Sequence, residues 1–138
     1  MSEAPATPRP KGGLVAYLCV EGAQKAAQFY QQAFAADLAF IQPPDEKGRT
    51  MHVHLYVNDA SVMLSDPYPD HGHPYEPAAG FSLMLPVCDV DAWWQRAVDA
   101  GCTPSMPPQD MFWGDRYGQC KDPFGVTWAM VGPKSTAR

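Results

Sequence analysis

Charged residues are scarce in this 138-residue sequence, in which Asp, Glu, Lys and Arg together make up only 18%. The 10 Lys and Arg residues form no run, and the formal net charge is −5. Nucleic acids and anionic membrane surfaces are both bound through concentrated basic patches. We therefore expect no nucleic-acid and no membrane partner, which leaves small molecules and proteins.

Long apolar runs are missing as well. No stretch approaches the roughly 20 apolar residues that a membrane-spanning helix needs. The first ten residues, MSEAPATPRP, lack the apolar central region of a signal peptide. The expected location is the cytoplasm.

Motifs that bind common cofactors are also absent. The four cysteines, Cys19, Cys88, Cys102 and Cys120, lie far apart, without the close spacing of a zinc site or a redox pair, and we expect reduced thiols. Neither G-x-G-x-x-G nor G-x-x-x-x-G-K-[ST] occurs, so a nucleotide cofactor is not expected.

The sequence does contain two similar halves. Residues 13–20 form a strand pattern, an amphipathic helix pattern begins at Ala23, and strand patterns follow at 37–42, 51–57 and 61–66. The order repeats from residue 81, with a strand at 81–87 and a helix at 90–100. Because neither half can bury its own sheet alone, we predict one domain built from two βαβββ modules.

These patterns set the expected boundaries. Residues 1–12 are predicted to be a flexible leader and residues 134–138 a tail. The single domain covers residues 13–133, with modules at 13–66 and 81–133. The connector 67–80 holds four prolines and almost no aliphatic residue, and we predict no regular element there.

Two segments carry a family resemblance: AAQFYQQAFAADL in the first half and FWGDRYGQCKDPFGVTWAM (112–130) in the second. Together with the tandem modules, they resemble the vicinal oxygen chelate superfamily, within it the PhnB-like branch of the glyoxalase and bleomycin-resistance domains. The resemblance covers residues 13–132. It implies an α+β fold whose tandem βαβββ modules form a cup-shaped, partly open β-barrel, with a ligand cavity inside and a homodimer around it.

The family usually holds a divalent metal through four His, Gln or Glu side chains, two from each module. The matching positions here are Val15, Met63, Ser82 and Ala129. None of these side chains supplies an imidazole or carboxylate, and shifting the alignment by one residue does not restore one. We therefore expect no metal at the family positions and no other cofactor.

Two histidines remain candidates for chemistry. His52 and His54 alternate along a predicted strand, so both side chains should project from one face of the sheet. They are interpreted either as ligand-binding or proton-transferring groups, or as a hydrogen-bonded wall residue and a rim residue. His71 and His73 lie in the connector, where they would at most trap a metal adventitiously.

Aromatic and cationic side chains complete the candidate set. Trp113, Arg116 and Tyr117 offer an aromatic wall and a bidentate donor for an anionic group, although Arg116 could instead pair with Asp115. Three strand aromatics would line the cup if they face inward and would contact a second copy if they do not. These are Tyr17, Tyr56 and Trp128.

Three functions follow from these residues. The first is a small-molecule-binding protein whose cavity takes an aromatic or cationic ligand. The second is a lyase, isomerase or dioxygenase with a relocated metal at His52 and His54, for which Asp66 is the nearest third ligand. The third is a metal-free enzyme in which His54 acts as general base and Arg116 fixes the substrate. The sequence leaves open whether any reaction is catalysed.

Overall fold

The structure, a computed structural model, describes residues 7–134. The first half of the predicted leader (1–6) and nearly all of the predicted tail (135–138) lie outside the described residues.

Two modules follow one another along the chain. The first consists of β1 (Ala16–Cys19), α1 (Ala23–Phe34), β2 (Asp37–Ile41), β3 (Val53–Val57) and β4 (Ala60–Ser65). The second consists of β5 (Leu83–Pro86), α2 (Val90–Ala100), β6 (Thr103–Asp110), β7 (Asp115–Lys121) and β8 (Thr127–Pro133). The predicted order of elements is confirmed.

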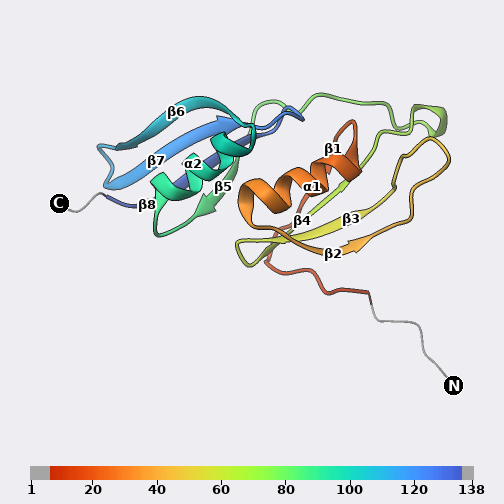
Figure 1. The fold of residues 1–138 in the computed structure, drawn as a ribbon, viewed down its shortest axis with the longest axis horizontal. Coiled ribbons are helices and arrows are strands. Elements are labelled where there is room, and N and C mark those ends of the chain that lie inside the picture. The colour runs from red at the N-terminus through yellow and green to blue at the C-terminus, as the bar shows by residue number, and fades with distance from the viewer. Residues whose placement is uncertain (1–6, 135–138) are drawn as a thin grey trace, which may run out of the picture.

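Each module forms one four-stranded mixed sheet, ordered β1-β4-β3-β2 or β5-β8-β7-β6. The first strand of each module runs parallel to the last, whereas the other pairs are antiparallel. Helices α1 and α2 pack against each other, and Figure 1 shows them side by side in front of their sheets. The α+β fold with two βαβββ modules is therefore confirmed as two adjacent sheets.

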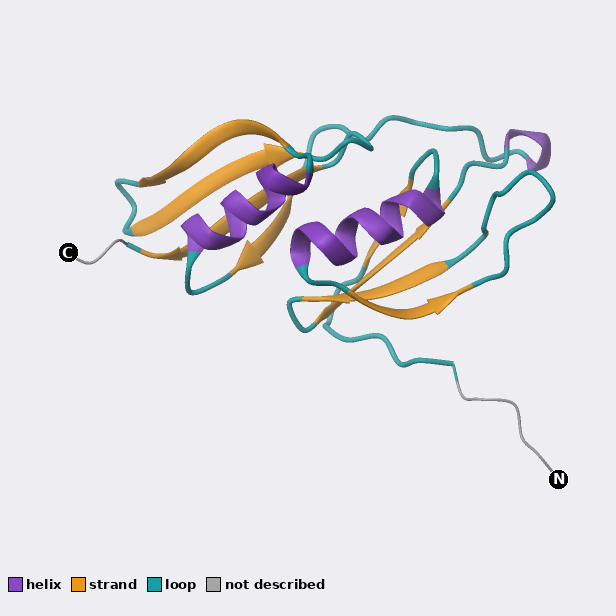
Figure 2. Ribbon diagram, viewed as in Figure 1, coloured by secondary structure: helices purple, strands orange, loops and turns teal. Residues whose placement is uncertain are grey.

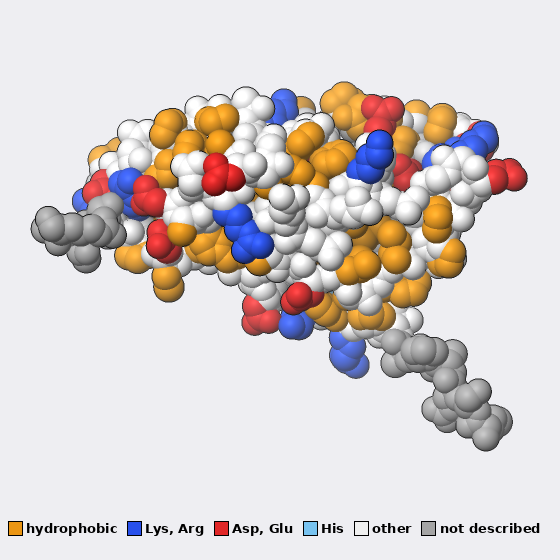
Figure 3. Space-filling model, in the orientation of Figure 1, with side chains coloured by type: hydrophobic (Ala, Val, Ile, Leu, Met, Phe, Trp, Pro, Cys, Tyr) orange, Lys and Arg blue, Asp and Glu red, His pale blue; other side chains and the backbone are white. Residues whose placement is uncertain are grey.

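The connector between the modules is mostly irregular, as predicted. Figure 2 shows a loop interrupted by one short 3₁₀ helix, η1 (Pro69–His71). None of the helices in residues 7–134 is both long and apolar enough to cross a membrane. On the face drawn in Figure 3, Lys and Arg side chains lie scattered among acidic ones and form no basic stripe.

The core lies between the sheets and the helices. The apolar stripe of α1 is fully buried and includes Ala26, Ala27, Tyr30 and Phe34. Trp128 of β8 packs against this stripe, with its ring centroid 4.2 Å from that of Phe34 and 5.3 Å from that of Tyr30. A helix of the first module and a strand of the second therefore share one core.

A buried carboxylate joins the modules inside this core. Asp122, which follows β7, accepts hydrogen bonds from the hydroxyl of Tyr30 at 2.5 Å and from Nε1 of Trp128 at 2.8 Å. Its other oxygen accepts the backbone N–H groups of Phe124 and Val126 at 2.8 and 3.0 Å. Burial and the neighbouring carboxylate raise the pKa of Tyr30, so its hydroxyl remains a donor across the physiological range.

The second half of the predicted leader is held against the first sheet. The backbone N–H of Lys11 donates to Oγ of Ser61 at 2.7 Å, and the N–H of Ser61 donates to the carbonyl of Lys11 at 2.9 Å. The hydroxyl of Tyr56 donates to the carbonyl of Arg9 at 2.8 Å. Residues 9–11 therefore lie against the β3–β4 hairpin, which offers partners for their backbone groups, while the flexibility of the leader stays a prediction.

We predict that Tyr30→Phe lowers the free energy of unfolding by about 1.5–3 kcal/mol, because it removes a hydrogen bond to a buried charged group. Tyr56→Phe is the matched control. It also removes one hydroxyl, but that hydroxyl is exposed and water replaces its bond to Arg9, so a loss of about 1 kcal/mol or less is expected. Urea unfolding measures the loss in the free energy of unfolding for each variant. Equal losses would show that the Tyr30–Asp122 bond contributes no more than an exposed hydrogen bond.

Candidate functional site

The candidate site begins on the face of the first sheet that points away from α1, here called the open face. Along β3, Val53, Leu55 and Val57 are buried toward the helix, so the alternate residues lie on the open face. The strand register places neighbours from β1, β2 and β4 beside them. The open face thus carries Tyr17, Phe40, His52, His54, Tyr56 and Met63.

Tyr17 and His52 form a stacked, hydrogen-bonded pair on this face. Their ring centroids lie 5.7 Å apart, with an interplanar angle of 24°. The Tyr17 hydroxyl donates to the carbonyl of Met51 at 3.2 Å and lies 3.0 Å from Nδ1 of His52. Burial raises the pKa of Tyr17, so the hydroxyl stays protonated at neutral pH. The pair therefore presents a planar surface that can stack on a ligand.

His54 is 1% exposed, and its imidazole is used internally. Nε2 lies 2.7 Å from Oγ of Ser61, which also accepts the backbone N–H of Lys11 at 2.7 Å. Because Ser61 already accepts one bond, its own proton can go to the neutral imidazole. Burial, with a smaller contribution from His52, lowers the pKa of His54. The residue therefore stays neutral, and its Nε2 is occupied by Ser61.

The four family positions for metal ligands lie on the expected faces. Met63 pairs with His54 and with Tyr17 across the sheet, and Val15 directly precedes β1. In the second sheet, Ala129 pairs with Met84, and Ser82 precedes that strand. These side chains cannot hold a hard divalent ion. Within residues 7–134, no group of three His, Cys, Asp or Glu side chains is placed to bind a metal ion.

Asp66, expected as the nearest third ligand beside His52 and His54, is used elsewhere. Its carboxylate accepts the backbone N–H groups of Gly22 at 2.8 Å, Ala23 at 3.0 Å and Thr50 at 2.8 Å. It therefore caps the N-terminus of α1, whose own N-cap residue Gly22 provides no side chain.

The predicted site residues of the second module do not act together. Trp113 and Tyr117 form an edge-to-face pair with centroids 6.0 Å apart, and Trp113 is half exposed. Arg116 points to α2 instead, where it binds Asp91 through two hydrogen bonds of 2.6 and 2.8 Å. It also binds Asp110 at 3.2 Å, and not Asp115 as considered from the sequence. Because these carboxylates take its donors, the structure favours a structural role for Arg116, and its role as a substrate anchor stays a prediction.

Trp128 also departs from its predicted position. Its side chain is 1% exposed, packs on α1 and donates to Asp122, so it belongs to the core. It also borders a cavity of about 350 Å³ together with Val15 and Ser82. The reason for its burial is strand alternation: in β8, Trp128 and Met130 face the helices, whereas Ala129 lies between them and faces the other way.

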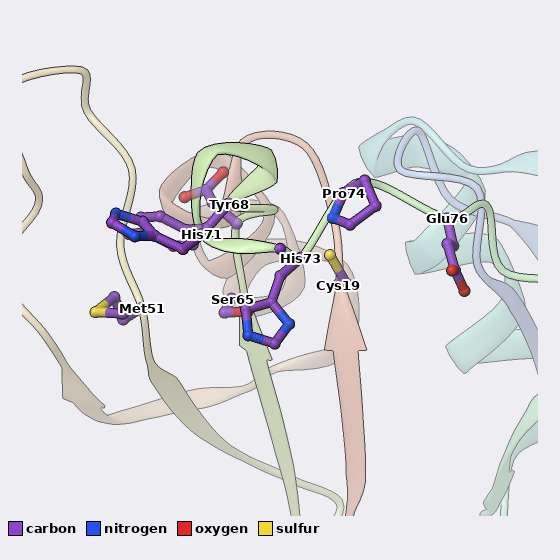
Figure 4. A pocket seen from close by; sticks show the side chains of 10 residues that line it. Cys19, Met51, Ser65, Tyr68, His71, His73, Pro74 and Glu76 are labelled. Carbon is purple, nitrogen blue, oxygen red and sulfur yellow. The ribbon is translucent and has the colours of Figure 1, made fainter.

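A cavity of about 490 Å³ opens at the end of the first sheet, where the parallel strands β1 and β4 finish and the connector returns. Figure 4 shows its lining side chains, with His73 beside Ser65 and Cys19, and His71 beside Tyr68. The full lining is Cys19, Met51, Ser65, Asp66, Tyr68, His71, Gly72, His73, Pro74 and Glu76. Met51 joins this cavity to the open face, because its carbonyl receives the Tyr17 hydroxyl.

One arginine holds the connector over this cavity. Arg49 donates to Asp45 at 3.0 Å and to Asp70 at 2.8 and 3.3 Å, and its guanidinium lies 4.4 Å from the ring centroid of Tyr68. The pairing lowers the pKa of Asp70 to about 2. The contacts join the loop before β3 to the 3₁₀ helix η1.

Sequence reasoning missed this cavity because its residues come from three separate segments. Cys19 was interpreted only as a reduced thiol, and the connector as a passive link. The one available signal was the density of His, Tyr and Glu residues between the prolines of residues 67–80, which is unusual for a connector without function.

We predict that protonation of His54 destabilises the fold. Because the folded state lowers the pKa of His54 below its ordinary value of 6.5, the unfolded chain binds the proton first as the pH falls. The stability is therefore complete above pH 6.5 and decreases as the pH falls below that value. Urea unfolding at pH 7.5 and at pH 5.5 measures how much the free energy of unfolding decreases with the pH. This decrease should be smaller in His54→Gln than in the wild type, whereas His73→Gln should match the wild type. An unchanged pH dependence in His54→Gln would contradict this assignment.

Comparison with known proteins agrees with the fold. An uncharacterized protein of Mycobacterium tuberculosis, Rv0887c, is 39% identical over 124 residues, which are 85% of this chain and 72% of that protein. The crystal structure of PA1353 from Pseudomonas aeruginosa has a TM-score of 0.72 at 30% identity and covers 88% of this chain and 98% of its own. A PhnB protein of Bacillus cereus shares the fold, with a TM-score of 0.66 at 20% identity, over 88% of this chain and 99% of its own. Residues 13–130 match the Glyoxalase/Bleomycin resistance protein/Dioxygenase superfamily, and the chain is a member of that family.

Proposed function

We propose that this protein binds a small aromatic or cationic molecule on the open face and in the adjoining cavity, without the metal of its family. The observation that carries the proposal is the set of residues at the four family ligand positions, Val15, Met63, Ser82 and Ala129. Side chains of this kind favour contact with an apolar ligand and cannot polarise a substrate oxygen as a bound cation would.

The geometry gives less support to the two enzymatic functions. A relocated metal at His52 and His54 would compete with Tyr17 and Ser61 for the imidazole nitrogens, and Asp66 already caps α1. A metal-free mechanism would need His54 and Arg116 at one substrate. His54 is buried in the first sheet, whereas Arg116 faces α2 in the second module.

A homodimer is part of the proposal. Several large apolar side chains are about half exposed, among them Tyr17 and Met51 near the first open face and Met84 and Trp113 in the second module. Exposed large apolar side chains of this kind support a partner surface. A second copy that covers the two open faces would turn each of them into one wall of an enclosed cup.

The first test is the metal content of tag-free protein after incubation with Ni, Zn, Mn or Fe(II) and removal of free ions. We expect less than one tightly held ion per chain by elemental mass spectrometry. The His73→Ala variant, which lacks one imidazole of the connector, is the control for adventitious metal binding there. One ion per chain that disappears in His52→Ala or His54→Ala would overturn the proposal in favour of a metalloenzyme.

The second test is a thermal-shift screen of aromatic compounds, with and without a positive charge, followed by calorimetry on any compound that stabilises the protein. Tyr17→Ala should weaken binding by about tenfold, because it removes a stacking surface whose loss is worth roughly 0.5–1.5 kcal/mol beyond its area. Leu38→Ala is the matched control, because Leu38 is also half exposed on the first sheet but pairs with Leu55 on the helix-facing side. Equal weakening in both variants would remove the open face from the binding site.

A further inference from the structure

The cavity at the end of the first sheet is lined by acidic side chains and by no Lys or Arg. Its lining contains two carboxylates, Asp66 and Glu76. The charge of Asp66 is met by three backbone N–H groups at the start of α1. In the part of the chain that the structure describes, no hydrogen bond or ion pair is recorded for the carboxylate of Glu76. Glu76 is therefore the acidic group available to a ligand.

The charged groups around Cys19 indicate that the electrostatic potential inside the cavity is negative. Burial raises the pKa of this thiol, and the charges of Asp66, Glu76 and Glu21 raise it further. No basic side chain acts in the opposite direction on this group. The guanidinium of Arg49 does not line the cavity and is bound to Asp45 and Asp70. A cation placed here meets attraction, and an anion meets repulsion.

The remaining walls suit a planar group. Tyr68 and the imidazoles of His71 and His73 contribute flat surfaces, and Met51 adds a polarisable thioether. The ring of Tyr68 already has a cationic partner, because the guanidinium of Arg49 lies 4.4 Å from its centroid, so this wall suits the aromatic part of a ligand. A volume of about 490 Å³ lies within the range of small-molecule sites.

We propose that this cavity selects an organic cation, a planar aromatic group bearing a protonated amine, with Glu76 as its counter-ion. The inference rests on the proposed function. It narrows the ligand from a molecule that is aromatic or cationic to one that is both aromatic and cationic. The aromatic part lies toward Tyr68 and the open face, and the ammonium group lies toward Glu76 and Cys19.

The test compares three probes of nearly the same shape on the full chain: benzylammonium, benzyl alcohol and benzoate. Calorimetry or ligand-observed NMR should show benzylammonium binding roughly twofold to fivefold more tightly than benzyl alcohol, the range for an ion pair with an exposed carboxylate. Benzoate should bind more weakly than both. Added salt should reduce the preference for the cation, since exposed charges are screened.

Variants then assign the preference to one residue. Glu76→Gln should abolish the difference between benzylammonium and benzyl alcohol and leave the affinity for the alcohol unchanged. Glu46→Gln removes an acidic charge outside the lining and should retain the difference. Saturating benzylammonium should also slow alkylation of Cys19, while the exposed Cys88 keeps its rate as an internal reference.

The outcomes distinguish a failure of the charge inference from a failure of the proposed small-molecule function. Equal binding of benzylammonium and benzyl alcohol would overturn the inference about charge and leave the small-molecule function standing. A preference that survives in Glu76→Gln, or no protection of Cys19, would overturn the assignment to this cavity. Failure of all three probes to bind would overturn the inference, and the function itself would then be judged by the wider screen and the Tyr17→Ala variant.

Discussion

The buried carboxylate of Asp122 is the interaction on which the arrangement of the two modules depends. A buried charge is tolerated only when its hydrogen bonds are complete, and one of the four donors, the hydroxyl of Tyr30, reaches it only after the modules dock. Tyr30 lies 92 residues away in the first module. Once its hydroxyl reaches Asp122, α1 is fixed against β8, and Trp128 fills the space between them. The relative position of the two sheets, and hence of their open faces, follows from this contact.

A second buried carboxylate fixes the candidate site itself. Asp66 ties the end of β4 to the N-terminus of α1 and to Thr50, which precedes β3. The floor of the cavity is therefore rigid. The connector above it is held differently, through ion pairs of Arg49 whose carboxylate partners are partly exposed. Because exposed ion pairs contribute little stability, the walls can adjust to a ligand more easily than the floor.

Much of this fold is readable from the sequence because its elements are defined by local periodicity. Helix spacing in 23–34 and 90–100 and the strand patterns around them predicted both modules. The bounds of the strands before residue 101 differ by a few residues, and the three strands after it were not placed individually. The orientation of single strand residues is a different matter, since it depends on register, and a change of one position reverses the face. Trp128 illustrates the point: once Ala129 is placed on the ligand face, its neighbour must face the core.

Residues whose roles depend on distant partners could not be predicted in the same way. Arg116 stands next to Asp115 in sequence, but its partners are Asp91 on α2 and Asp110 across the β6–β7 hairpin. No local pattern contains that information. The cavity was missed for a related reason, because the ends of β1 and β4 and the connector 67–80 meet only in the folded chain. Sequence periodicity therefore predicts the scaffold, while the polar partners of the site require the tertiary structure.

The open face and the cavity divide the task of recognition between them. On the open face both imidazoles are engaged within the protein, His52 by Tyr17 and His54 by Ser61, and Met63 stands where the family has a metal ligand. That face therefore offers apolar and aromatic contact to a ligand. In the proposal, charge is discriminated at the cavity, whose lining holds Glu76 and neither Lys nor Arg. A ligand with one flat and one positively charged end would meet both surfaces in a single orientation, whereas a neutral flat molecule could reverse.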